Sequence, residues 1–119
     1  MNRYKVFLDS KLKPSDVIER LEDKTFLHYY LEEDWEIARN YEEFINTILQ
    51  KHTEEKTLMF VSLGHDVGEK NGYECVNWLS AYIAEFKMEF PTFAIHTKNG
   101  QGAKNMQKLL TTFLDGYYC

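Results

Sequence analysis

Four short apolar runs, each rich in β-forming residues, alternate along this chain with longer segments of helical periodicity. The runs cover residues 5–8, 35–39, 58–63 and 93–95. The run at 58–63 is the most continuously apolar, as expected of a central strand that is covered on both faces. A strand followed by a helix, repeated four times, is typical of a parallel sheet with right-handed crossovers. The sequence therefore predicts an α/β fold.

Apolar residues at spacings of three and four predict a helix after each strand. They are Val17, Ile18 and Leu21 in the first helix; Phe44, Ile45, Ile48 and Leu49 in the second; Val76, Leu79, Ile83 and Phe86 in the third; and Met106, Leu109, Leu110 and Phe113 in the last. The first helix, capped by Ser15 or Asp16, is expected to have barely two turns. Asn40 and Glu43 have the spacing of a capping box, which predicts that the second helix runs from about 41 to 51.

The stretch at 25–34 interrupts this alternation, because it is aromatic and then acidic and has no clear period. We expect an irregular or hairpin-like insertion there. Its residues Tyr29 and Tyr30, together with Trp35, either pack into the core or stack on a base or a protein partner. The second alternative makes residues 25–35 a candidate surface for a homodimer or for another protein.

The length and charge of the chain limit its organisation and its partners. With 119 residues, of which 44% are hydrophobic, the chain has enough apolar material for one core, so we expect a single domain over residues 1–119. Acidic residues outnumber basic ones by 19 to 14, which gives a formal net charge of −5. No basic run is long enough to follow a phosphate backbone, which argues against long nucleic acid but not against a local nucleotide pocket.

Targeting and redox features favour the cytoplasm. The first residues lead directly into a strand with no apolar signal region, and no run approaches the ~20 apolar residues of a membrane span. Cys75 falls within a helical pattern and Cys119 is the last residue, so the two do not resemble a disulfide framework. We expect a soluble, cytoplasmic protein that does not bind membranes.

Three of the predicted strands end on polar residues that can do chemistry. Asp9 follows the first, Gly64-His65-Asp66 follows the third, and His96 follows the fourth. If these strands are parallel neighbours, their carboxyl ends lie side by side, where open α/β sheets bind their ligands. Imidazoles titrate near neutral pH, so His65 and His96 can activate water or protonate a leaving oxygen at such a site.

Residues after the fourth strand have the chemistry of an anion site. Thr97 and Asn99 can donate hydrogen bonds to phosphate oxygens. Gly100-Gln101-Gly102 leads into the last helix and offers backbone amides at the positive end of the helix dipole. Together these residues predict a phosphate cradle.

The chain resembles the cyclic-phosphate processing receiver-like family, a branch of the response-regulator receiver fold. Four linked motifs carry the resemblance over nearly the whole chain: Val6-Phe7-Leu8-Asp9-Ser10-Lys11-Leu12-Lys13-Pro14; Ser62-Leu63-Gly64-His65-Asp66-Val67-Gly68; Gly72-Tyr73 with Trp78-Leu79; and His96-Thr97-Lys98-Asn99 with Gly102 and Met106. The resemblance implies a three-layer, flavodoxin-like domain with a parallel sheet in the order 2-1-3-4 and helices on both faces. The sequence has four candidate strands and no fifth one after the last predicted helix, unlike an ordinary receiver. The resemblance also implies processing of a cyclic phosphate.

Several positions depart from the pattern of that family. They are Ser10 for a second acid after the first strand, Leu12 for an arginine, Gly64 for the first acid of an Asp-His-Asp run, Thr97 for a serine, and Gly100 where proline is frequent. Receivers that bind a divalent cation use such carboxylates as hard oxygen ligands. Asp9 and Asp66 are therefore the remaining candidates for ligands of Mg²⁺.

These residues leave three functions open. In the first, the chain acts on the cyclic phosphate of a nucleotide or an RNA end, with His65 and His96 as proton-transfer groups and Asp66 assisting them. In the second, it is a degenerate member that binds a nucleotide or a protein without turnover. In the third, the segment at 25–35 binds a partner or a second copy. The candidate phosphate-binding residues are Thr97, Asn99, Gly102 and Ser10.

Overall fold

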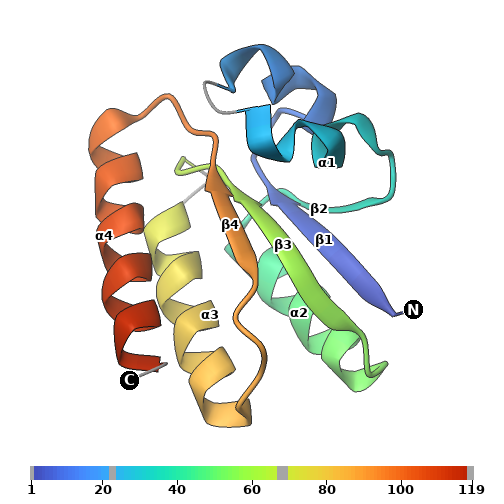
Figure 1. Cartoon of the computed structure of the whole chain (residues 1–119), viewed down its shortest axis with the longest axis vertical. Helices are drawn as coiled ribbons and strands as arrows, with labels where there is room; N and C mark the ends of the chain where they lie inside the picture. The colour runs from blue at the N-terminus through green and yellow to red at the C-terminus, as the bar shows by residue number, and fades with distance from the viewer. Residues whose placement is uncertain (1, 22–23, 67–69, 118–119) are drawn as a thin grey trace.

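A parallel four-stranded sheet in the order β2-β1-β3-β4 forms the centre of the structure (Figure 1). Its strands are β1 (Arg3–Leu8), β2 (Trp35–Ala38), β3 (Thr57–Leu63) and β4 (Thr92–Ile95). The α/β fold and the strand order expected from the sequence are confirmed. The most apolar run is indeed an inner strand, since β3 pairs with β1 on one side and with β4 on the other.

The computed structural model describes residues 2–21, 24–66 and 70–117. Cys119 and the Val67-Gly68 end of the second motif lie outside the described residues. Within these ranges, no helix combines the length and the hydropathy that are needed to cross a membrane.

Three helices cover one face of the sheet. They are α2 (Tyr41–Thr53), α3 (Gly72–Phe86) and α4 (Gly100–Tyr117), and Figure 1 shows α3 and α4 side by side. Their apolar sides close over the strand residues Val6, Leu8, Val61 and Leu63, all of them fully buried. The helical residues in this core include Phe44, Ile48, Val76, Leu79, Ile83, Met106 and Leu110, as the spacing in the sequence predicts.

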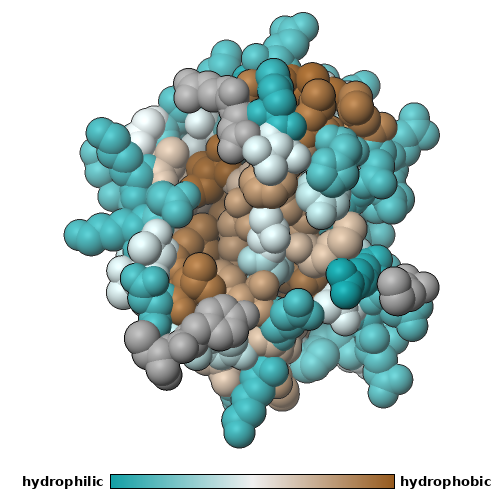
Figure 2. All heavy atoms as spheres, in the orientation of Figure 1, coloured by the Kyte–Doolittle hydropathy of each residue, from teal (hydrophilic) through white to brown (hydrophobic). Residues whose placement is uncertain are grey.

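The opposite face is covered by shorter elements. A seven-residue 3₁₀ helix, η1 (Pro14–Arg20), and a three-residue one, η2 (Lys24–Phe26), precede the five-residue α1 (Leu27–Leu31). In Figure 1 this segment lies above the carboxyl ends of the strands, and in Figure 2 apolar side chains gather over the middle of the same face. Helices on both faces are thus confirmed, with the longer ones all on one side.

The sequence predicts an irregular or hairpin-like segment around α1. It is not a hairpin, because it contains the two short helical elements η2 and α1. The physical reason is burial, since Tyr30 and Trp35 pack against Phe7 and Phe60 of the sheet and Val17 of η1. The aromatic residues of this segment therefore build a second core.

A buried lysine ties this segment to the sheet. Lys5 on β1 is 1% exposed, and its ammonium group donates hydrogen bonds to Glu32 and, over 2.7 Å, to Asp34. The same Nζ lies 5.1 Å from the centre of the Trp35 ring and 5.6 Å from that of Tyr29. Burial alone would lower the pKa of Lys5, but the hydrogen bonds and charges of the two carboxylates outweigh it and raise the pKa.

Side-chain caps start the longer helices. Asn40 accepts a hydrogen bond from the Glu43 N–H over 2.9 Å, as expected of a capping box. The Glu43 carboxylate then accepts from the N–H of Arg39 rather than from that of Asn40, so the reciprocal bond is displaced by one residue. Asn71 caps α3 through the Glu74 N–H.

Candidate functional site

The register of the sheet brings the predicted strand-end residues together. Leu8 is aligned with Leu63, and Leu63 with Ile95, so the residues that follow them occupy neighbouring positions. Backbone hydrogen bonds extend the alignment, because the N–H of Gly64 donates to Leu8 and the N–H of His96 donates to Leu63. The carboxyl edge of β1, β3 and β4 therefore presents Asp9, Gly64 and His96 side by side.

The Asp9 and His96 side chains form a direct pair. Oδ2 of Asp9 lies 2.9 Å from Nε2 of His96, whose side chain is 1% exposed. The imidazole stacks on the Phe7 ring with 4.6 Å between ring centres and 2° between planes. The pair therefore lies inside the protein, below the surface at which a ligand would first make contact.

Two further side chains continue this pair into the core. Nδ1 of His96 lies 2.7 Å from Oγ of Ser62, which in turn lies 2.7 Å from the hydroxyl of Tyr30. One direction of donation gives each of these groups a partner: Tyr30 to Ser62, Ser62 to Nδ1 of His96, and Nε2 of His96 to Asp9. The sequence did not identify Tyr30 and Ser62 as parts of the site.

The Asp9 carboxylate is fully engaged by the protein. Its Oδ1 accepts hydrogen bonds from the N–H groups of Lys11 and Leu12, each over 2.9 Å, while Oδ2 faces His96. Burial alone would raise the pKa of Asp9, but the His96 contact and the two amide bonds outweigh it and hold the pKa well below its usual range. Asp9 is thus an ionised group that orders the loop following β1.

Gly64 makes room for this pair. A Cβ added at position 64 would lie 2.8 Å from the Leu8 carbonyl oxygen, 3.1 Å from Oδ2 of Asp9 and 3.3 Å from Nε2 of His96. The first of these contacts is with backbone, which cannot rotate away. The absence of a side chain at position 64 therefore has a steric reason in this structure.

His65 belongs to a separate group of side chains and is itself partly buried, with 14% of its side chain exposed. Its Nδ1 lies 3.1 Å from Oδ1 of Asp66 and 3.2 Å from Nδ2 of Asn99. Oδ1 of Asn99 accepts from the Gly102 N–H over 2.9 Å, which fixes the orientation of the amide. Nδ1 can donate to Asp66 when it carries a proton and can accept from Asn99 when it does not. Each tautomer of the imidazole therefore has a partner.

The remaining predicted phosphate ligands also have structural partners. Thr97 Oγ1 accepts from the Asn99 N–H over 3.2 Å, and Ser10 Oγ donates to the Asp66 carbonyl over 3.2 Å. A Cβ at Gly102 would lie 2.5 Å from the His65 ring, so the glycine allows the imidazole to lie against the start of α4. The structure thus gathers the predicted residues into one region, where several of them position others.

Two arginines that the sequence did not single out lie at the same edge. The guanidinium group of Arg39 donates to the carbonyls of Asp9, over 3.1 Å, and of Leu12. The Arg20 guanidinium lies 3.5 Å from the carbonyl oxygen of His96. The resemblance noted above places an arginine at the position of Leu12; here the Arg39 guanidinium group reaches the carbonyl of that residue from the end of β2.

The carboxylates that the structure describes do not assemble a site for Mg²⁺. Both oxygens of Asp9 already accept hydrogen bonds, and the Asp66 side chain is 78% exposed beside His65. Among the described residues, no group of three carboxylate, imidazole or thiol side chains lies close enough to hold a metal ion. Mg²⁺ requires several hard oxygen ligands in near-octahedral geometry, which this donor set does not supply.

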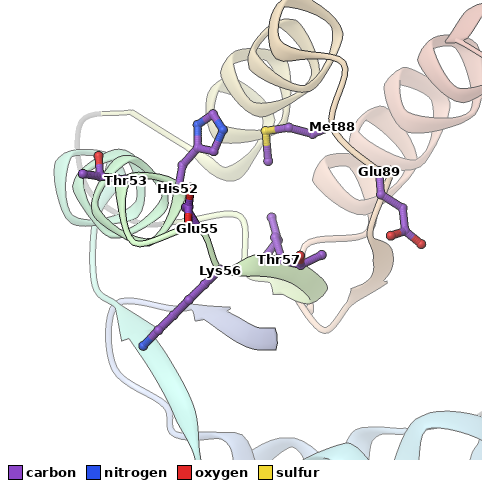
Figure 3. A pocket seen from close by; sticks show the side chains of 8 residues that line it. His52, Thr53, Glu55, Lys56, Thr57, Met88 and Glu89 are labelled. Atoms are coloured by element: carbon purple, nitrogen blue, oxygen red, sulfur yellow. The ribbon is translucent and has the colours of Figure 1, made fainter. Parts of the chain in front are cut away.

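A groove of about 490 Å³ opens between α3 and α4, and His65 forms part of its wall. The groove is also lined by Asn71 and Tyr73 at the start of α3 and by Lys108 on α4. A second cavity of about 550 Å³ lies at the amino end of β3, around Thr57, Met88 and Glu89 (Figure 3). Only the first groove reaches the residues at the carboxyl ends of the strands.

One of three comparisons with known proteins found a match. A family model described as a cyclic-phosphate processing receiver domain matches residues 4–112. No match was found among curated proteins or among solved structures.

Proposed function

Because the chain belongs to the family of cyclic-phosphate processing receiver domains, we propose that it hydrolyses the cyclic phosphate of a nucleotide or an RNA end. The observation that supports this proposal best is the environment of His65. Its Nδ1 lies between Asp66 and Asn99, its ring lines a groove, and its Nε2 has no hydrogen-bond partner among the residues that the structure describes.

This environment suits a group that must both accept and donate a proton. When Asp66 accepts the proton on Nδ1, Nε2 carries a lone pair and can act as a base. Protonation of Nε2 then gives an imidazolium that the Asp66 carboxylate stabilises. Opening of the cyclic phosphate needs these two proton transfers, because one proton leaves the attacking water and another reaches the departing ribose oxygen.

The proposed reaction proceeds by attack of water on the phosphorus atom. Nε2 of His65 takes a proton from the water as the new P–O bond forms. The bond from phosphorus to one ribose oxygen breaks, and that oxygen receives the proton from Nε2. The product is a phosphomonoester with a free neighbouring hydroxyl group. The step balances with water alone and consumes no metal ion or other reactant.

The start of α4 supplies donors for the phosphate. The N–H groups of Gly100 and Gln101 have no intrahelical acceptor, because they belong to the first turn of the helix. Thr97 uses its oxygen to accept from Asn99, which leaves its hydroxyl proton for a phosphate oxygen. Arg20, beside the carbonyl of His96, adds positive charge next to Thr97.

We assign His96 a positioning role, since its side chain is buried and engaged at both nitrogens. The pair with Asp9 orders the amides of Lys11 and Leu12. Ser10 lies in the same loop and donates to the Asp66 carbonyl, so the loop holds the residue that orients His65. The buried hydrogen-bonded side chains and the partly buried imidazole of His65, which is 14% exposed, are coupled in this way.

A second function is favoured by the state of Asp9. Its carboxylate is committed to protein hydrogen bonds, and Gly64 stands where an acid is usual in the family. Such a site suits a degenerate member that binds a nucleotide or a protein without converting anything. The experiment must therefore distinguish binding without hydrolysis from hydrolysis of the cyclic phosphate.

The test is incubation with 2′,3′-cyclic and 3′,5′-cyclic nucleotides, with and without Mg²⁺, followed by phosphorus NMR. We expect new phosphomonoester signals with the wild type that are lost with His65→Gln. His28→Gln is the matched control, because His28 is an exposed histidine outside the site. Shifted lines without new signals would favour the binding function, and unchanged spectra for all compounds would exclude both for these ligands.

A further inference from the structure

The groove between α3 and α4 carries features that hydrolysis of a phosphate ring does not require. Its wall includes His65 at one place and, away from it, Tyr73, Asn105, Lys108 and Leu109. Its volume of about 490 Å³ falls in the range of small-molecule pockets, roughly 300–1,000 Å³. A cyclic phosphate alone would leave most of this space empty.

We propose that this groove binds the nucleoside of the substrate and that Lys108 contacts a second phosphate on its 5′ side. The inference rests on the proposed function for the position of the cyclic phosphate at His65. It specifies the substrate class as a nucleotide that carries a terminal cyclic phosphate and at least one further phosphate, as at the 3′ end of a short RNA.

The charge distribution supports an anionic ligand here. The chain has a formal net charge of −5, yet residues 90–114 contain three lysines and no acidic residue. Lys108 lines the groove and forms no ion pair with any residue that the structure describes. An exposed ammonium group without a carboxylate partner is available to a phosphate oxygen.

The spacing along α4 fits a ligand longer than one phosphate. The His65 ring lies against Gly102, and Lys108 follows six residues later, about 9 Å further along the helix at the usual rise. Helical side chains lean toward the amino terminus, which brings the ammonium group back toward His65. A nucleoside can therefore lie between the two, with a phosphate at each end.

The side chains between these positions suit a base and a sugar. Tyr73 keeps 39% of its surface exposed, so its ring is available for stacking, and Leu109 adds an apolar contact. Oδ1 of Asn105 accepts from Gln101 over 2.9 Å, which directs its amide N–H groups to other acceptors. A base edge offers such acceptors.

The experiment compares three ligands: glycerol 1,2-cyclic phosphate, adenosine 2′,3′-cyclic phosphate, and the same nucleotide with a 5′-phosphate. The readout is kcat/KM where phosphorus NMR shows turnover and Kd where it does not, so failure of hydrolysis leaves the comparison intact. We expect Lys108→Gln to lower kcat/KM, or to raise Kd, about tenfold for the 5′-phosphorylated ligand, as for the loss of one charge-assisted contact, and to leave the values for the other two ligands unchanged. Tyr73→Leu should have the same kind of effect on both nucleotides but not on the glycerol compound.

Lys104→Gln is the matched control. Lys104 lies on the same helix, is exposed and does not line the groove, and its replacement changes the net charge equally. Equal effects of Lys104→Gln and Lys108→Gln would overturn the inference, because a general charge effect would then explain both. The inference would also be overturned if the wild type bound or converted the glycerol compound as well as it does the nucleotides, although the proposed hydrolysis of a cyclic phosphate would then still stand. It would be overturned too if the wild type neither bound nor converted either nucleotide.

Discussion

Nε2 of His96 and Oδ2 of Asp9 lie 2.9 Å apart, although 87 residues separate them in the sequence. The pair joins the end of β1 to the end of β4 across Gly64. Hydrogen bonds through Ser62 and Tyr30 continue it along the face of the sheet that η1 and α1 cover, where His96 stacks on Phe7. The same contacts that place the candidate chemistry therefore also hold the second core against the strands. Changes at this pair should affect stability as well as function.

Asp9→Asn should lower the free energy of unfolding at pH 7 by about 1–3 kcal/mol, because it removes the charge from a partly buried, hydrogen-bonded carboxylate. The folded protein holds the pKa of Asp9 below its ordinary value of 3.8, so this contribution is present above that value and is lost as the pH falls through the lowered pKa. The difference between wild type and variant in urea unfolding should thus shrink from pH 7 to pH 3. Asp66→Asn, at an exposed carboxylate, is the control and should change stability by less than about 0.5 kcal/mol.

Gly64→Ala should destabilise the protein by about 1–3 kcal/mol, because the new Cβ would lie 2.8 Å from the Leu8 carbonyl oxygen. Gly116→Ala is the matched control. Nothing lies within 4 Å of a Cβ at that position in α4, so alanine should be neutral or stabilising by up to about 1 kcal/mol. Thermal unfolding of the two variants gives the comparison, and equal stability of Gly64→Ala and wild type would show that the strand ends move apart at little cost.

The positions of the strands follow from sequence features that act locally, whereas the resemblance to a known family supplies their order. Apolar runs with β-forming residues mark the strands, and helical spacing marks α2, α3 and α4. The segment around α1 could not be predicted in the same way, because no period identifies it. Its structure depends on contacts with residues distant in the sequence, such as Tyr30 with Ser62 and Glu32 with Lys5.

The site was predictable to the level of the strand ends, but not to the level of hydrogen bonds. The parallel arrangement of neighbouring strands places Asp9 near His96, but nothing in the sequence predicts that the imidazole of His96 faces inward. Ser62 was the available signal, since it is the polar residue within the apolar run of β3, on the face opposite to Val61 and Leu63. The catalytic and binding roles of the candidate residues stay predictions.

Lys5→Met tests how much the buried ammonium group contributes to stability and how this contribution depends on pH. Methionine keeps much of the apolar volume of the lysine side chain but removes its bonds to Glu32 and Asp34. Because the pKa of Lys5 is raised in the folded state, its contribution is complete below the ordinary pKa and is lost as the pH rises through the folded one. Wild type should therefore lose stability above about pH 10, and the variant should lack this alkaline loss. Urea unfolding at pH 7 and pH 11 measures the change in the free energy of unfolding. Equal losses in wild type and variant would show that other groups cause the alkaline loss of stability.

Gly102→Ala separates the position of His65 from its chemistry, because the variant keeps the imidazole. A Cβ at position 102 would lie 2.5 Å from the ring, so the ring must leave its place between Asp66 and Asn99. We expect hydrolysis to fall by about 100-fold, the size of effect that follows from misplacing a general acid or base, while the free energy of unfolding changes by less than about 1 kcal/mol. Gly116→Ala is the control, since a Cβ there meets nothing within 4 Å and the residue lies near the other end of α4, so activity should be retained. A Gly102→Ala protein with wild-type activity would contradict the assignment of His65, because a displaced imidazole could not then be the group that transfers the proton.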